Sequence, residues 1–193
     1  MDEAPAAPSY ALPDGWFLAG SAPDNYLAGV DYTTYYGPTP ARGGILVSGP
    51  NYKAVAGGFG TVMQAFNPTN LLGKRVQMSG FVKSTGVINW AGMWMRIDRL
   101  LEQAHAFDNM HNRSITGTTD WTEYKIVLDA PEDSAMLAFG FLLIGEGTIW
   151  IDEVNFQIVD PDKVPVTGGG PNGPATPAKI PKGLLDHPIN LSF

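Results

Sequence analysis

The sequence predicts a single all-β domain, a jelly-roll β-sandwich of two antiparallel sheets. Its 193 residues suit one domain with a sizeable core. Charged residues make up only 16% of the chain, whereas it contains 23 glycines and 16 prolines. This composition is typical of short strands joined by many turns, because long surface helices need more Glu, Lys and Arg.

The strands are expected wherever a short apolar segment lies between clusters of Gly, Pro, Asn and Asp. In order, they are Trp16–Gly20, Tyr26–Asp31, Gly44–Ser48, Thr61–Phe66, Arg75–Lys83, Ala91–Asp98, Tyr124–Leu128, Met136–Ile144 and Thr148–Val159. One stretch, Arg99–Phe107, has a helical pattern, so we expect a short helix there.

Two of these segments predict their own surroundings, because successive side chains of a strand point to opposite faces. Met136–Ile144 is apolar on both faces, which predicts a central strand. Thr148–Val159 changes phase, since the apolar residues before Asp152 and those after Glu153 fall on opposite faces. One extra residue at Asp152–Glu153, a β-bulge, returns all of them to the core side.

The two ends of the chain differ in composition from the middle. The start is rich in Ala and Pro, and the stretch after the last long strand is rich in Pro and Gly. The expected organisation is a disordered segment over 1–13, a sandwich over 14–159, an irregular linker over 160–188 and a short apolar tail over 189–193.

Composition also excludes several classes of function. The formal charge is −7, so the surface repels phosphate backbones and we expect no nucleic-acid partner. The absence of cysteine excludes disulfides, thiol catalysis and thiolate metal sites. No apolar run reaches the roughly 18 residues that a membrane span needs, so no membrane partner is expected.

The N-terminal segment MDEAPAAPSYALP has neither the basic nor the apolar region of a signal peptide. We expect it to be the trimmed start of a periplasmic or secreted protein. A native cytosolic start is the alternative.

The segment WAGMWMRID, residues 90–98, is the strongest candidate for a binding face. If it is a strand, its odd-numbered apolar residues face the core. The other face then carries Trp90, Gly92, Trp94, Arg96 and Asp98. Indole rings stack on flat apolar surfaces, including the C–H faces of sugars, while Arg and Asp hydrogen-bond hydroxyls. Gly92 would leave a bare patch of backbone between the indoles. The alternative is that the indoles pack under a second layer and that Arg96–Asp98 is a structural salt bridge.

The loop after this strand is the second candidate. Its potential ligand contacts are His105, Asp108, Asn109, His111 and Arg113. The six-residue spacing of the two histidines matches no zinc motif. A plain surface loop is the alternative. An enzyme that uses a histidine of this loop with Asp108 and Arg113 is a further hypothesis, although no catalytic motif identifies a reaction and we assign no catalytic residue.

Three segments resemble the jelly rolls of the carbohydrate-binding-module and galactose-binding-like superfamily. They are Leu12-Pro-Asp-Gly-Trp16, Gly73-Lys-Arg-Val-Gln-Met-Ser-Gly-Phe-Val82 and Ile149-Trp-Ile-Asp-Glu-Val-Asn-Phe156. The middle portion, with WAGMWMRID and FGFLLIGEGTIW, is also similar to accessory domains of bacterial transcription regulators and peptidases. The resemblance implies a sandwich and, in many members, a structural Ca²⁺ held by the Asp of the closing strand. That residue is Asp152, but the Glu that completes the family's site has no counterpart here.

The superfamily's usual first strand, N-x-x-F-E, is missing upstream of Leu12, and a similar segment, Asn190-Leu-Ser-Phe193, lies at the other end. We therefore expect Ile189–Phe193 to form a strand that fills the missing place, with Leu191 and Phe193 in the core. Docking on the same chain gives a monomer, and docking on a neighbour gives a strand-swapped homo-oligomer.

Three functions remain open at this stage. The favoured one is a non-catalytic binding module for a carbohydrate or a similar small polar ligand. The alternatives are a sensor or protein-interaction domain of a bacterial regulatory system and an enzyme of unknown reaction.

Overall fold

The computed structural model describes residues 8–170 and 176–193, which fold into strands joined by turns. The strands are β1 (Phe17–Gly20), β2 (Tyr26–Asp31), β3 (Gly43–Ser48), β4 (Phe59–Phe66), β5 (Lys74–Arg99), β6 (Glu102–Asp108), β7 (Ile115–Ala130), β8 (Ser134–Ile144) and β9 (Thr148–Val159). Three short 3₁₀ turns are η1 (Pro23–Asn25), η2 (Thr69–Leu71) and η3 (His111–Arg113). Within these ranges no helix has the length and apolar character needed to cross a membrane.

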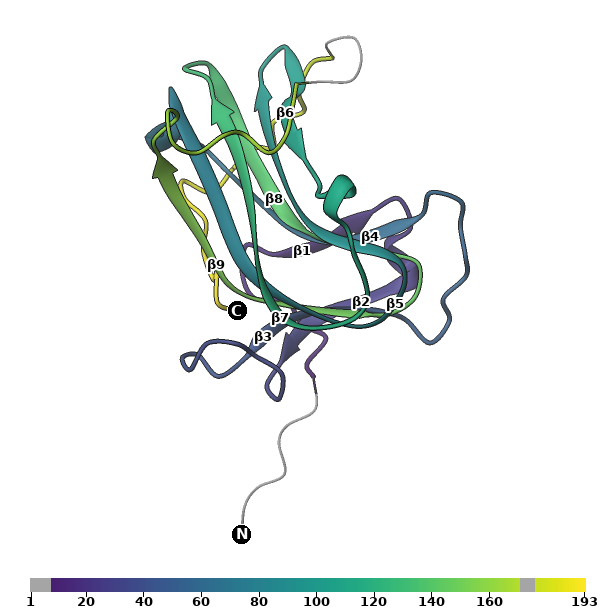
Figure 1. Cartoon of the computed structure of the whole chain (residues 1–193). Helices are drawn as coiled ribbons and strands as arrows, with labels where there is room; N and C mark the ends of the chain where they lie inside the picture. Colours follow the sequence, from purple (N-terminus) through teal and green to yellow (C-terminus); the bar gives the residue numbers. More distant parts are fainter. Residues whose placement is uncertain (1–7, 171–175) are drawn as a thin grey trace.

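Strand β5 belongs to both layers of the sandwich. Its first half, Lys74–Thr85, pairs with β7 and β9, and its second half, Trp90–Arg99, pairs with β8 and β6. One layer, here called the β9 sheet, has the order β7-β5-β9-β3-β2. The other, the β8 sheet, has the order β1-β4-β8-β5-β6. Figure 1 shows the two layers, with β9 in one and β8 and β6 in the other.

The crossing between the layers explains the main difference from the expected strands. Arg75–Lys83 and Ala91–Asp98 are two halves of one strand of 26 residues. The register with β7 shifts three times between Val82 and Ala91, and Gly86 has a φ of +60°. Glycine adopts this conformation without a Cβ clash. The strand therefore bends between its halves instead of stopping.

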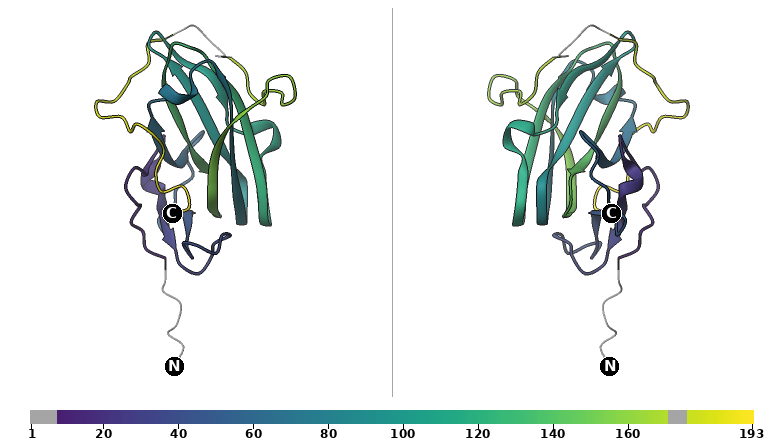
Figure 2. Two further views of the ribbon diagram at one scale, coloured as in Figure 1. Left: turned by 90° about the vertical axis from the view of Figure 1, so that its left-hand side faces the viewer. Right: turned by 90° about the vertical axis from the view of Figure 1, so that its right-hand side faces the viewer.

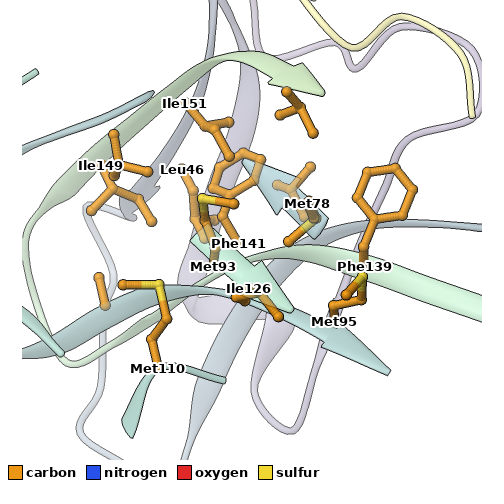
Figure 3. Close-up of a cluster of buried hydrophobic side chains, with 14 of the residues drawn as sticks. Leu46, Met78, Met93, Met95, Met110, Ile126, Phe139, Phe141, Ile149 and Ile151 are labelled. Atoms are coloured by element: carbon orange, nitrogen blue, oxygen red, sulfur yellow. The ribbon is translucent and has the colours of Figure 1, made fainter. Parts of the chain in front are cut away.

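The core lies between the inner faces of the two sheets. Figure 3 shows Met93, Phe139 and Phe141 of the β8 sheet against Met78 and Ile151 of the β9 sheet. All of these side chains are buried. Four methionines fill this space, and their unbranched side chains suit an irregular gap between twisted sheets. They are Met78, Met93, Met95 and Met110.

The expected bulge in β9 is confirmed. Ser79 of β5 pairs with Asn155 and Phe81 pairs with Asp152, so β9 has one extra residue there, and Glu153 adopts a φ of +52°. Val154 is buried with the residues before the bulge. Ile158 is exposed although its partner Val76 is in the core, so the expectation that the bulge returns all the apolar residues to the core side is wrong for Ile158.

The expected helix at Arg99–Phe107 is wrong. These residues turn at Leu100–Leu101 and return as β6 beside β5. The two leucines are exposed at the turn. In the sequence, two leucines flanked by charged residues resemble one face of an amphipathic helix. The Asp98 carboxylate fixes the return strand by accepting the amide N–H of Ala104, whose φ is +54°.

Ile189–Phe193 packs on its own sandwich as a turn, so the expected strand is wrong. Asn190 and Phe193 have positive φ values of 51° and 50°, and the Phe193 amide donates to the Asn190 carbonyl. Residues in this conformation leave the extended path that a strand needs. Figure 2 shows the segment descending along the sandwich to the strands near the N-terminal end.

The tail joins the two layers. The Gln64 side chain on β4 exchanges two hydrogen bonds with the backbone of Ile189, at 2.9 and 2.8 Å. On β9, the Val154 amide donates to the Leu191 carbonyl at 3.0 Å. The Phe193 ring stacks on Trp16 with a centroid distance of 4.7 Å and is 1% exposed.

A glycine makes room for this ring. A Cβ on Gly44 would lie 2.6 Å from the Phe193 ring, which is far inside van der Waals contact. The position of Phe193 therefore depends on glycine at position 44 of β3.

The other predictions for the chain ends have mixed outcomes. Residues 1–7 of the segment expected to be disordered lie outside the described residues. The expectation is wrong at Ser9, which exchanges two backbone hydrogen bonds of 2.8 Å with Val30. In the expected linker, Gly169 pairs with Phe107 and Thr167 with Val127, while residues 171–175 lie outside the described residues.

Phe193→Ala should lower the free energy of unfolding by roughly 3–5 kcal/mol, the usual cost of emptying a buried Phe site. Leu101→Ala is the matched control, because Leu101 is exposed and should leave stability unchanged. Chemical denaturation measures both. Equal stability of the two variants would show that the tail is not part of the cooperative core.

Candidate functional site

A groove lies on the outer face of the β8 sheet, the face turned away from the core. Its volume is about 450 Å³, within the range of small-molecule and cofactor sites. It crosses all five strands of the sheet. The lining residues are Ala19, Gly20, Phe59, Thr61, Met63, Trp90, Trp94, Arg96, Phe107, Asn109, Leu142 and Ile144.

The two indoles take different places in this groove. Trp94 is 6% exposed and forms the floor, with Ala138 and Leu142 packed beside it. Its Nε1 donates to the Thr61 hydroxyl at 2.7 Å, and that hydroxyl donates to the Phe141 carbonyl. Trp90 is only partly buried.

Trp90 also contacts the loop beside the groove. Its ring meets His111 edge-on at a centroid distance of 5.4 Å. The expectation that Trp90 and Trp94 share the outer face is therefore confirmed, with one ring as the floor and the other more open to solvent.

Arg96 brings the one charged side chain of the lining into the groove. Its Nε and Nη2 donate to Asp98 Oδ2 at 3.1 and 2.9 Å. Asp98 is fully buried, and its other oxygen accepts the Ala104 amide at 2.6 Å. The expectation that Asp98 contacts a ligand is wrong, because both of its oxygens are already bonded out of reach of solvent. Asp98 instead positions Arg96.

Gly92 lets the following loop form a wall of the groove. A Cβ at Gly92 would lie 3.0 Å from the Asn109 carbonyl oxygen and 3.2 Å from Met110 Cβ. The expected bare patch of backbone at Gly92 is therefore wrong. The loop covers it, and Asn109 reaches the groove.

The other polar residues of the loop do not converge on the groove. His105 pairs with Glu102 at 2.8 Å, and the hydrogen bond from His105 is the main cause that lowers the pKa of Glu102. Asp108 is buried and accepts from the Met110 amide and, through both oxygens, from Arg113.

These loop contacts hold the loop together. The hypothetical catalytic arrangement of a histidine with Asp108 and Arg113 is not assembled in the groove. A second, more open hollow of about 390 Å³ lies on the other side of the loop. Its lining residues are Phe107, Asp108, Asn109, His111, Asn112, Thr167 and Gly168.

Asp152 is not in a calcium environment. One carboxylate oxygen accepts the amides of Tyr36 and Gly37 at 2.8 and 3.1 Å, and the other accepts the Glu153 amide. Burial raises the pKa of Asp152 and outweighs these three hydrogen bonds, which lower it. N–H donors occupy the positions around the carboxylate that a cation would take, so Asp152 does not fit the role of a Ca²⁺ ligand. It instead links the β2–β3 loop to β9. No cluster of three or more metal-binding side chains is found in the described part of the chain.

The sequence thus predicted Trp90, Trp94, Arg96 and Asn109 but not the rest of the lining, which is mostly apolar. The missed residues are Ala19, Gly20, Phe59, Thr61, Met63, Phe107, Leu142 and Ile144. One signal was present, since Met136–Ile144 is apolar on both faces although only one face meets the core. The other residues depend on strand pairings that the sequence does not encode locally.

Comparison with known proteins supports the architecture. No known family model matches the chain. The chain is 41% identical over 179 residues to an uncharacterized HTH-type transcriptional regulator, YbfP, of Bacillus subtilis (strain 168). The match covers 93% of this chain and 56% of that relative. The chain therefore spans little more than half the length of the curated relative that it matches.

Among solved structures, the chain is similar to the CBM22-1 xylan-binding domain from Paenibacillus barcinonensis Xyn10C. The TM-score is 0.52 with 16% identity, over 82% of this chain and 99% of that one. It is also similar to a family 16 carbohydrate-binding module, with a TM-score of 0.53 and 15% identity, over 75% of this chain and 91% of that one. The fold is therefore a jelly-roll sandwich of the carbohydrate-binding-module type.

Asp98→Ala should lower the free energy of unfolding by roughly 3 kcal/mol, near the low end for breaking a buried pair, because it leaves the Ala104 amide and Arg96 without their acceptor. Asp120→Ala, which breaks a surface pair with Lys83, should leave the stability nearly unchanged. Urea denaturation compares the two. A small loss for Asp98→Ala, equal to that of the control, would contradict the positioning role.

Proposed function

We propose that this domain is a non-catalytic carbohydrate-binding module whose ligand lies in the groove on the β8 sheet. The observation that carries the proposal is the combination of indole rings with one fixed guanidinium in a single open groove. The partly open Trp90 ring offers a flat apolar surface, and Trp94 supplies the floor. Arg96 provides directional hydrogen bonds beside them.

The shape of the groove suits a chain of sugars. Five strands, and so four steps between neighbouring strands of about 4.8 Å each, give a length of roughly 19 Å across the sheet. The apolar lining, which comes from all five strands, provides contact along this path. The jelly-roll likeness to carbohydrate-binding modules supports the fold on which such a groove is built.

Trp90→Ala should weaken oligosaccharide binding at least about tenfold, equivalent to about 1.4 kcal/mol, because the stacking ring is removed. Trp121→Ala is the matched control, since Trp121 lies on the β9 sheet near Tyr36 and away from the groove. Isothermal titration calorimetry against a panel of soluble oligosaccharides provides the affinities.

Absence of binding to every glycan on a broad array would overturn the proposal. So would binding that Trp121→Ala weakens and Trp90→Ala leaves intact.

The second candidate is a sensor domain of a bacterial regulatory system. The observation that favours it is the 41% identity to a protein named as a transcriptional regulator, across nearly the whole of this chain. On this hypothesis the groove binds a small soluble sugar whose occupancy is transmitted to another part of a longer protein.

Chain-length dependence separates the two candidates. A module for sugar polymers should bind more tightly as the oligosaccharide grows, until the groove is filled. A sensor for a small metabolite should reach full affinity with a mono- or disaccharide. Calorimetry with a series of one to six sugar units measures this, and a flat series would favour the sensor.

A further inference from the structure

We infer that the groove on the β8 sheet selects acidic sugars, specifically sugar chains that carry a carboxylate, over their neutral counterparts. This inference rests on the proposed function and names its ligand class. It comes from the hydrogen-bonding capacity of the lining, atom by atom.

The free polar side-chain atoms of the lining are donors. Arg96 uses Nε and Nη2 on Asp98, and its Nη1 has no acceptor among the described residues. The Asn109 side chain uses its oxygen to accept the His111 amide, which leaves its NH₂ group. Trp90 Nε1 also has no acceptor within the described ranges.

The lining is poor in side-chain acceptors, and those it has already take part in hydrogen bonds. The Thr61 hydroxyl accepts from Trp94 and donates to the Phe141 carbonyl, and Thr61 is buried. The lining contains no Asp or Glu. Asp98, the carboxylate behind Arg96, is fully buried, with both oxygens bonded.

The free Arg96 nitrogen is accessible from outside the protein. Every buried side-chain nitrogen and oxygen among the described residues has a partner. Nη1, which has none, is therefore accessible, and Arg96 lines the groove. The fork toward Asp98 fixes the plane of the guanidinium, so little side-chain entropy remains to be lost when a ligand binds.

These features match an acceptor better than a hydroxyl. A sugar hydroxyl both donates and accepts, and this lining offers its proton no carboxylate. A carboxylate only accepts, and its hydrogen bonds to a guanidinium are roughly twice as strong as neutral ones. In this arrangement the sugar rings contact Trp90 and Trp94, and the carboxylate of the sugar pairs with Arg96.

The test compares α-1,4-linked trigalacturonate with the same trisaccharide after reduction of its carboxylates to alcohols. Calorimetry should show at least tenfold tighter binding of the acidic form, and this preference should shrink as the NaCl concentration rises, because salt screens the charge. The neutral form should be insensitive to salt.

Variants assign the preference to the guanidinium. Arg96→Met with Asp98→Asn removes both charges together, so that no buried charge is left alone, and Asn keeps an acceptor for the Ala104 amide. This double variant should bind both trisaccharides with the affinity of the neutral form. Lys83→Met, which removes a partly exposed cation on the β9 sheet, should keep the full preference. A melting curve of each variant confirms folding, and Arg96→Gln with Asp98→Asn, which also removes both charges, serves as the second variant if the first double variant unfolds.

The outcomes separate this inference from the proposed function. Equal affinity for the two trisaccharides, both weakened by Trp90→Ala, overturns the selectivity and leaves the carbohydrate-binding function standing. A preference that survives the double variant also overturns it. Failure of both trisaccharides and of all neutral glycans to bind overturns the proposed function itself.

Discussion

The passage of β5 from one sheet to the other is the constraint on which the rest of the structure depends. Because one continuous strand serves both layers, the pairing of β7 and β9 with its first half sets the position of its second half in the β8 sheet. The inward side chains, such as Met93, belong to the core, and the outward ones, Trp94 and Arg96, belong to the groove. Packing in the core therefore fixes the spacing of the groove residues, which is how a rigid site is held on regular elements rather than on loops.

Two buried connections complete this arrangement. Asp98 ties the end of β5 to the start of β6 and holds Arg96 toward the groove. The tail ties β4 to β9, with Phe193 filling the space above Gly44. Each connection holds together two segments that would otherwise be joined only through the backbone. The strands that line the groove are thus held in place by the core, on which their inner faces pack, and by the tail, which links β4 to β9.

The sequence predicted what depends on local pattern. Alternation placed the side chains of residues 90–98 on their correct faces, and the change of phase in β9 located the bulge. What failed depends on geometry between distant segments. The exposed Leu100 and Leu101 imitated a helix, because only the pairing of β6 with β5 shows that they form a turn. The tail was expected to be a strand because it is similar to the superfamily's first strand. Such a motif carries no information on backbone angles, and the positive φ values of Asn190 and Phe193 make the tail a turn.

The central claim is that sugars bind in the β8-sheet groove. The most direct test is an NMR titration in which an oligosaccharide that binds is added to the protein and the indole N–H signals of the five tryptophans are followed. Trp90 and Trp94 line the groove, whereas Trp16 is in the core and Trp150 lies on the far sheet with its Nε1 bonded to Asp31. The account predicts that the Trp90 and Trp94 signals move on titration while those of Trp16, Trp121 and Trp150 stay in place. Movement of Trp121 and Trp150 with Trp90 and Trp94 unmoved would contradict it.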